Sequence, residues 1–509
     1  MKTVCSIETF LQSMAADSTG SAASPLGQSF VAAGSPGELI RIKISVDPVE
    51  EISEIVRQAD ARFAIPPVLL FEEVRGSRFP VVANLLATPE RCARAMGVGG
   101  WHEIGSLFPA NEEPAKEASL FGWGATCSPV SRQRSAASQQ VVRLGADVDL
   151  MILPACKRHA QESQATLFQA QSVTVGSQGD RHVDTGDLHV IDAKTIACDW
   201  PIGHRSWRHL AEAASEGRQL PVVLTLGPDM ATHALTGRWL ATHESVWGSD
   251  LWAFIGRRRE GGFSTARARS LEVDVPVEAE IVIEGIIDTH SPRHRLTHSS
   301  RKTGWQPAAD ELPVIRVTAM THKALPIVPL VMPESREAHQ IDRILEQVAF
   351  QRLSSIVPAL RELHFPARNE GHQVVLARIQ RHNADQARQL IHAIWSLPVL
   401  GEAKLVVVVD EDVDLANPEV VWRAVAREVS FQEDLESTRG NLVPWVVSDA
   451  LPNDPLTHEA LGKSILRGQK LGIDATRKSR SGLSRLPGPG GVGQRVEERW
   501  REYGLPFVL

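Results

Sequence analysis

The sequence predicts a multidomain α/β protein, and three observations lead to this fold class. The 509 residues, 43% of them hydrophobic, can bury more than one core, and chains beyond about 250 residues tend to divide into domains. Strand-like and helix-like patterns alternate in the first and last thirds. The middle third has short apolar runs between turn residues, which is typical of a β-rich domain. We therefore expect an α/β domain at 1–135, a β-rich domain at 136–330 and a second α/β domain at 331–509.

The amino-terminal domain is expected to begin after residue 37. Residues 15–37 are rich in Ser, Ala, Gly and Pro without a sustained period, so they are predicted to form a loop. Strand and helix signals alternate beyond that point. The expected elements are a strand at Leu39–Val46, a helix at Glu50–Asp60, a strand at Val68–Phe71 and a helix at Pro89–Met96.

The central domain is predicted to contain many short strands and one interposed helix. The helix is expected at Trp207–Glu216. The strands are expected at Val148–Leu153, Leu188–Ile191, Thr195–Cys198, Val222–Leu226, Leu271–Val275, Ile281–Ile287 and Val314–Val317.

In the carboxy-terminal domain, four consecutive valines, Val406–Val409, mark a strand that cannot be half-exposed. Alternate side chains point to opposite faces of a sheet, and here both faces are apolar. We therefore predict a central strand of a covered, parallel sheet. The acidic residues that follow it, Asp410, Asp412 and Asp414, either bind a ligand or metal at the carboxyl end of the sheet or form a solvated cap.

The helices of this domain have their own signals. Ser335 can cap a helix, because its hydroxyl can accept a hydrogen bond from an amide of the first turn. The apolar face of that helix is formed by Ile341, Ile344, Leu345, Val348 and Leu353. Further helices are expected at Ala387–Trp395 and Pro418–Ala426.

Charge and cysteine content exclude several classes of protein. A net charge of −7 and a pI near 6.2 give no basic footprint for nucleic acid. The five cysteines are widely separated and form no Cys-x-x-Cys pair, which favours a reducing cytoplasm over a disulfide framework or a zinc site. No run of about 18 apolar residues and no signal-peptide pattern is present. We expect a soluble, cytoplasmic protein without a membrane span.

Eight segments of the chain carry a resemblance to a known family: Gly37–Ile42, Val46–Pro48, Pro66–Glu72, Arg75–Gly76, Pro80–Leu85, Glu280–Gly285, Lys404–Asp414 and Gly468–Lys478. Together they resemble the UbiD family of prenylated-flavin (de)carboxylases. The resemblance implies a central split β-barrel that is related to flavin reductases and binds the cofactor. It also implies a non-oxidative carboxy-lyase acting on an aromatic or α,β-unsaturated carboxylic acid, with prenylated FMN and a divalent metal such as Mn, in a homo-oligomer.

The catalytic residues of the family are altered in this chain. The family places two acids around an arginine, and one acid protonates the product carbon. Counting from Trp200 puts Asp187 at the arginine position. Counting from Thr303–Trp305 puts Arg301 at one acid and Arg295 or Leu296 at the other, and leucine has no proton to give. A guanidinium stays charged and is no useful proton donor. Either Asp187, Arg295 and Arg301 form a paired cluster with inverted charges, or the loop has drifted to a solvated basic surface.

The candidate metal ligands are also inferred from the resemblance. The family uses an asparagine, a histidine and a glutamate. The nearest candidates here are His182 or Asp184, His204, and Asp250. A set of His and Asp ligands suits manganese, iron or zinc better than magnesium.

Four residues match family positions that line or approach the cofactor: Trp200, Arg205, Gly227 and Met230. Gly227 would let backbone amides come close to a ligand, although a glycine after a strand is also an ordinary turn residue.

Two functions are consistent with these observations. The first is a UbiD-like carboxy-lyase, which whole-chain resemblance favours. The second is a non-catalytic UbiD-like subunit or scaffold that binds a flavin-type ligand, or an active UbiD-type paralogue in a hetero-complex. The altered acid and arginine positions motivate the second.

Overall fold

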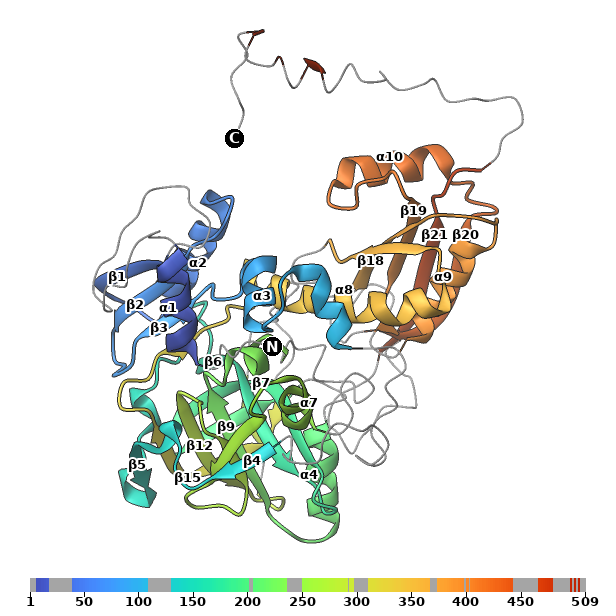
Figure 1. The fold of residues 1–509 in the computed structure, drawn as a ribbon. Helices are drawn as coiled ribbons and strands as arrows, with labels where there is room; N and C mark the ends of the chain where they lie inside the picture. Colours follow the sequence, from blue (N-terminus) through green and yellow to red (C-terminus); the bar gives the residue numbers. More distant parts are fainter. Residues whose placement is uncertain are drawn as a thin grey trace.

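The structure is a computed structural model, and its three largest sheets are shown in Figure 1. The amino-terminal and carboxy-terminal sheets lie on opposite sides of helices α3 (Pro89–Ala95) and α8 (Arg336–Ile356), and the barrel lies below them. The residues described are 6–17, 39–108, 130–200, 205–235, 250–291, 293–296, 310–366, 373–397, 400–401, 403–442, 466–478 and a few between 495 and 503.

The amino-terminal sheet has four strands in the order β1-β2-β3-β16. Strands β1 and β2 are parallel and are joined by α2, as the alternating pattern predicted. The last strand comes from the far end of the barrel segment, so the chain returns to this sheet before α8 begins. The bounds are β1 Leu39–Val46, α2 Glu51–Arg62, β2 Val68–Val74, β3 Val81–Ala83 and β16 Val328–Pro329.

The central domain contains a closed barrel of six antiparallel strands in the order β12-β9-β6-β7-β8-β15. Pairing of β12 with β15 closes the ring, and β5 (Val141–Leu144) adds to β15. This confirms the predicted fold class, with a β-barrel between two α/β parts. The barrel strands are β6 Ala165–Val175, β7 Arg181–Asp192, β8 Thr195–Asp199, β9 Leu220–Leu226, β12 Ile281–Ile287 and β15 Val314–His322.

The two faces of the barrel wall belong to different cores. On β9, Val222 and Leu224 point into the barrel, where they meet Trp207 of helix α4 (Arg205–Ser215). Val223 points outward into a larger core shared with helices α5 (Met230–Leu235), α7 (Leu251–Arg258) and α8. The period-2 alternation of a strand produces this division. Helices therefore cover the outer face where β6, β7 and β9 lie side by side.

The carboxy-terminal sheet has the order β17-β18-β19-β21-β20. The valine strand is β19 (Leu405–Asp410), which lies in the middle and is parallel to both neighbours. The exposed fraction of Val406–Val409 is at most 1%, so the prediction of a covered central strand is confirmed. The other elements are β17 Leu360–His364, β18 Val374–Ile379, β20 Leu435–Leu442, β21 Leu466–Asp474, α9 Gln386–Ser396 and α10 Pro418–Glu428.

Two of the three acidic residues at the end of β19, Asp410 and Asp412, are bound by one arginine of the same domain. The backbone N–H of Arg477 donates to Asp410 Oδ2 at 2.8 Å, and its guanidinium pairs with Asp412. This arrangement favours the interpretation of these acidic residues as a solvated cap of the sheet over their interpretation as a ligand or metal site. The Ser335 cap is confirmed, since its hydroxyl accepts from the Ala338 amide at 3.1 Å.

Some predicted elements were wrong or missed. The expected strand at Val148–Leu153 is a short 3-10 helix, Leu150–Ile152, and the strand expected at Leu271–Val275 is displaced to β11, Asp274–Pro276. Helix α1 (Ile7–Asp17) precedes the point where we expected folding to begin. No helix among the described residues is long and apolar enough to span a membrane.

Candidate functional site

A row of buried polar side chains crosses the outer face of the barrel. Thr185 on β7 pairs with Gln171 on β6, which pairs with Thr225 on β9. The row continues through Val282 on β12 to Thr321 on β15. Directly paired residues share a face of the sheet, so all five side chains point outward beneath the helix layer. The four polar members are at most 2% exposed, which is unusual for side chains on the outside of a barrel.

Helix α5 covers part of this row. The Gln171 side-chain amide donates to the Thr232 carbonyl of α5 at 3.3 Å, and its oxygen accepts from Thr225 Oγ1 at 3.4 Å. In contrast, Thr185 Oγ1 and Thr321 Oγ1 are buried without a hydrogen-bond partner within the described part of the chain. A buried hydroxyl without a partner has a free-energy cost, so each is a position where a ligand or water would be stabilised.

Asp187 lies two residues beyond Thr185 on β7 and therefore faces the same way. Its side chain is 1% exposed, and Oδ1 accepts a hydrogen bond of 2.9 Å from the backbone N–H of Gln169. Gln169 has a left-handed φ of 50°, at a bulge in β6. Bulges redirect backbone groups, and such conformations are often found at functional sites. His189 continues the polar face and its Nδ1 is 2.9 Å from Thr166 Oγ1.

The turn after β9 is fixed from two sides. Gly227 has φ +60°, and a Cβ there would lie 2.5 Å from Glu280 Cγ, so the position requires glycine for conformation and for space. Burial raises the pKa of Glu280, which Lys323 pairs with at 2.8 Å. Asp229 accepts from the first amides of α5 and pairs with Arg259 at 2.6 Å. Met230, which begins α5, is fully buried.

Trp200, in contrast, lies inside the barrel. It is fully buried, its indole N–H donates to Ser172 Oγ at 2.7 Å, and it makes an edge contact with the Trp207 ring at 5.8 Å. The four residues predicted to approach a cofactor are therefore divided. Gly227 and Met230 lie at the end of β9, Trp200 is in the interior core, and Arg205 begins α4.

A second charged corner lies at the turn between β6 and β7, where α4 and α7 begin. Asp180 is 2.9 Å from Arg208 and 3.9 Å from Arg205, both on α4. The next residue, Arg181, forms an ion pair with Asp250, the N-cap of α7. Desolvation lowers the pKa of His209, whose Nε2 is 3.1 Å from Asp180 Oδ2.

This corner tests the predicted metal ligands. Both oxygens of Asp250 are occupied by Arg181 and by the amides of Trp252 and Ala253. His182 is buried, only the backbone of Asp184 is described, and His204 lies outside the described residues. Within the described ranges, no three His, Cys, Asp or Glu side chains are placed to hold a metal ion. The described residues of this corner do not fit a divalent metal, because Asp250 is already bound by Arg181, and the assignment of His204 as a ligand stays a prediction.

The predicted charge cluster is only partly described. Arg295 lies on β13 (His294–Leu296), which pairs with β14 (Asp310–Leu312), and its side chain is exposed. Asp187 is buried, so the two side chains occupy different environments. Arg301 lies outside the described residues, and its pairing with Asp187 stays a prediction.

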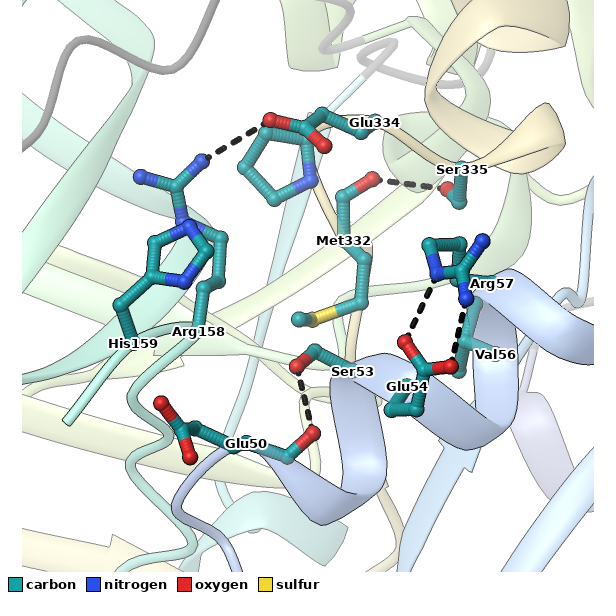
Figure 2. A pocket seen from close by; sticks show the side chains of 11 residues that line it. Glu50, Ser53, Glu54, Val56, Arg57, Arg158, His159, Met332, Glu334 and Ser335 are labelled. Carbon is teal, nitrogen blue, oxygen red and sulfur yellow. Dashed lines mark hydrogen bonds and ion pairs between the residues drawn. The ribbon is translucent and has the colours of Figure 1, made fainter. Parts of the chain in front are cut away.

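A separate pocket of about 410 Å³ lies between α2, the loop that contains Arg158, and the segment leading into α8 (Figure 2). Val56 and Met332 contribute its apolar lining. Both lining arginines are paired with carboxylates: Arg57 with Glu54, and Arg158 with Glu334 at 3.5 Å and with Glu162, outside the lining, at 3.0 Å. Three distant segments contribute to this pocket, so sequence reasoning did not predict it.

Sequence reasoning also missed Gln169, Gln171, Thr185 and Arg181. A signal was present in β7, where Thr185, Asp187 and His189 alternate with the apolar Leu188 and Val190. Such alternation predicts a strand with one polar face.

The architecture of the protein is a closed antiparallel barrel with a buried polar outer face, preceded and followed along the chain by strands of two α/β sheets. Three domain models of one carboxy-lyase family match the chain, described as 3-octaprenyl-4-hydroxybenzoate carboxy-lyase N-terminal (residues 34–108), Rift-related (129–336) and C-terminal (339–475) domains. The chain belongs to the UbiD family.

Relatives and solved structures agree with this assignment. An uncharacterized protein of Synechocystis sp. is 27% identical over 499 residues, covering 92% of this chain and 94% of the relative. The evolved dimeric form of the UbiD-class enzyme HmfF from Pelotomaculum thermopropionicum, in complex with prFMN, is 25% identical with a TM-score of 0.71, covering 90% and 95% of the two chains. The closed form of Sedimentibacter hydroxybenzoicus vanillic acid decarboxylase has the same fold, at 20% identity and TM-score 0.72, covering 99% and 100%.

Proposed function

We propose that this protein is a UbiD-like carboxy-lyase that acts on an aromatic or α,β-unsaturated carboxylic acid with prenylated FMN. The observation that carries the proposal is the buried polar outer face of the barrel, with an unpartnered Thr185 hydroxyl among the described residues, in a chain that matches all three UbiD domains. A planar ligand with polar edges suits such a face, because it would satisfy the buried hydroxyl.

The cofactor, when bound, supplies the electron sink for loss of carbon dioxide. The described residues would bind and orient it. Thr185 would present its hydroxyl to a ring edge, and Met230 with the Gly227 turn would limit the space at the end of β9. Helix α5 excludes water from this face, since its residues Met230–Leu235 are all buried.

Asp187 is the one family position of the three that carries a carboxyl group here. Arg295 and Arg301 cannot donate a proton near neutral pH. We therefore assign proton delivery to the Asp187 carboxyl group, which the Gln169 amide orients through Oδ1.

The second candidate is a non-catalytic UbiD-like subunit that binds a flavin-type ligand or an active paralogue. The specific observation in its favour is the pair of arginines, Arg295 and Arg301, at the family's acid positions. Under the first candidate we expect a homo-oligomer, and under the second a hetero-complex with a UbiD-type paralogue.

The test is co-production of the full chain with a flavin prenyltransferase, followed by absorption spectroscopy and decarboxylation assays on a panel of aromatic and unsaturated acids. We expect a flavin band and turnover. Asp187→Asn should keep the band and lose about 100-fold or more in kcat, because a positioned acid contributes roughly that factor. The matched control, Asp192→Asn at the exposed end of the same strand, should keep both the flavin band and the wild-type kcat.

The two candidates give different results. A flavin band without turnover of any acid, or a purified protein without flavin, would reject the carboxy-lyase and favour the subunit. Turnover that survives Asp187→Asn unchanged would retain the carboxy-lyase and reject our assignment of the proton donor.

A further inference from the structure

The strongest unassigned feature is the way Arg181 occupies the carboxylate of Asp250. Arg181 Nη2 contacts Oδ2 and Arg181 Nε lies 3.4 Å from Oδ1, so the guanidinium approaches both oxygens. Paired contacts of this type are the strong form of an arginine–carboxylate bond. The side chains are 16% and 24% exposed, so the pair is largely shielded from water.

The guanidinium is also held from a second direction. Its carbon lies 4.3 Å from the centre of the Trp252 ring, and Trp252 is fully buried in α7. A cation stacked on a fixed indole is restricted in orientation and gains an attraction to the ring face. Among the described residues, Nη1 of Arg181 has no hydrogen-bond acceptor, so this nitrogen can donate to a further group.

Three guanidinium groups gather at this corner. Arg181, Arg205 and Arg208 pair there with the carboxylates of Asp250, Asp180 and Glu212. Arginine forks match phosphate geometry as well as carboxylate geometry. Asp250 cannot ligate a metal ion unless Arg181 leaves it, and breaking a partly buried pair would leave both groups without their partner.

We propose that Arg181 takes the place of the divalent metal in this chain and binds a phosphate monoester while Asp250 holds it in place. The identity of the ligand as a flavin 5′-phosphate rests on the proposed function. The replacement of the metal by the Arg181 guanidinium does not. Arg181 and Asp187 point to the same outer face of β7, six residues apart, which is about 20 Å at the rise of a strand. That span is comparable to an extended flavin mononucleotide, with its phosphate at Arg181 and its ring near Thr185 and Asp187.

The first test uses the full chain, FMN and riboflavin as probes, and flavin fluorescence as the readout. We expect FMN affinity to be unchanged by EDTA or by added Mn²⁺. Arg181→Gln should weaken FMN binding by about tenfold or more, the usual loss of a charge-assisted hydrogen bond, without affecting riboflavin, which has no phosphate. The control is Arg132→Gln, which removes an arginine paired with Asp274 on a different sheet and should change neither.

If the FMN affinity of the wild-type protein is lost in EDTA and restored by Mn²⁺, the proposal is overturned. This measurement uses only the wild-type protein, so it does not depend on whether the variant folds. Equal FMN affinity in wild type and Arg181→Gln would also overturn the proposal. Direct titration with Mn²⁺, followed by electron paramagnetic resonance, should show no tight site in the wild-type protein.

A second readout separates this inference from the proposed function. If neither flavin binds, inorganic phosphate is the probe and the melting temperature is measured against equal ionic strength of chloride. A phosphate-dependent rise in wild type that is lost in Arg181→Gln would support the anion site even though the carboxy-lyase proposal had failed. An equal rise in both proteins, or no rise in either, would overturn it.

Discussion

Changing Glu337 to glutamine is expected to alter how the free energy of unfolding depends on pH. Glu337 is the second residue of α8 and is 1% exposed. Its carboxylate accepts hydrogen bonds from the backbone amides of Asn84 at 2.7 Å and Leu86 at 2.9 Å. Burial raises its pKa to about 7, although these amides favour the charged form. The charged or titratable groups that face it are Asp60 on α2, Arg91 on α3 and His233 on α5.

The sign and size follow from the two protonation states. The folded protein keeps the proton up to about pH 7, whereas the unfolded chain releases it near pH 4.5. Stability from Glu337 is therefore present at low pH and is lost as pH rises through this window. At about 1.4 kcal/mol per pH unit, the loss amounts to about 3 kcal/mol. Burial lowers the pKa of His233 to about 4, which gives the opposite slope, but His233 is present in both proteins and its effect cancels in their difference.

The assay is urea unfolding of the wild type and Glu337→Gln between pH 4.5 and 8. Glutamine does not titrate in this range. Its NH2 group replaces one of the two oxygens that accept from backbone amides, which lowers the free energy of unfolding by an amount that does not depend on pH. The variant should gain about 3 kcal/mol relative to the wild type over this range. Glu334→Gln, at an exposed position three residues away, is the control. Its free energy of unfolding should change with pH in the same way as that of the wild type. Parallel curves for Glu337→Gln would refute a buried acid with a raised pKa.

Three further outcomes are expected. Val407→Asp buries an unpaired charge in the central strand and should cost several kcal/mol, about 3 or more; an unchanged melting temperature and soluble yield would contradict the assignment. Gly227→Ala meets Glu280 and should destabilise by at least about 1 kcal/mol more in urea unfolding than Gly217→Ala, which has a similar φ of +64° but open space. In a double-mutant cycle, Asp187→Ala and Arg295→Ala should couple by less than about 0.5 kcal/mol, because Arg295 is exposed; coupling above 1 kcal/mol would restore the inverted-charge cluster.

The sequence predicted those elements whose two faces have a clear chemical pattern. The valines of β19 are apolar on both faces of the strand, and the helix capped by Ser335 has one apolar stripe, so the predictions of both elements were correct. Strand β6 was missed because Gln171, Ser172 and Thr174 interrupt its apolar residues. These side chains are nevertheless at most 1% exposed, because partners from other strands and helices satisfy Ser172 and Thr174 inside the barrel and Gln171 outside it. Tertiary partners of this kind are not visible in a local window.

The candidate site shows the same limit. Counting from Trp200 placed Asp187 at a family position, but its burial depends on the bulge at Gln169, which comes from the neighbouring strand. Asp250 was predicted as a metal ligand because the family resemblance makes it one of the nearest candidates for the family's ligand set. The sequence could not reveal that Arg181, 69 residues away, is close enough to occupy it.

Thr185 provides a test in which stability and binding change in opposite directions. Its hydroxyl is buried without a partner among the described residues, so Thr185→Val removes an unsatisfied group while keeping the shape. The protein without flavin should become more stable, by about 1 kcal/mol, whereas flavin affinity should fall by several-fold because a hydrogen bond to the ring is lost. Thr321→Val is the matched control, since Thr321 lies in the same row with the same unpartnered hydroxyl but on β15. It should gain stability and leave flavin affinity unchanged. If Thr185→Val leaves flavin affinity unchanged, the ligand does not lie along β7, and the polar row serves the packing of the barrel.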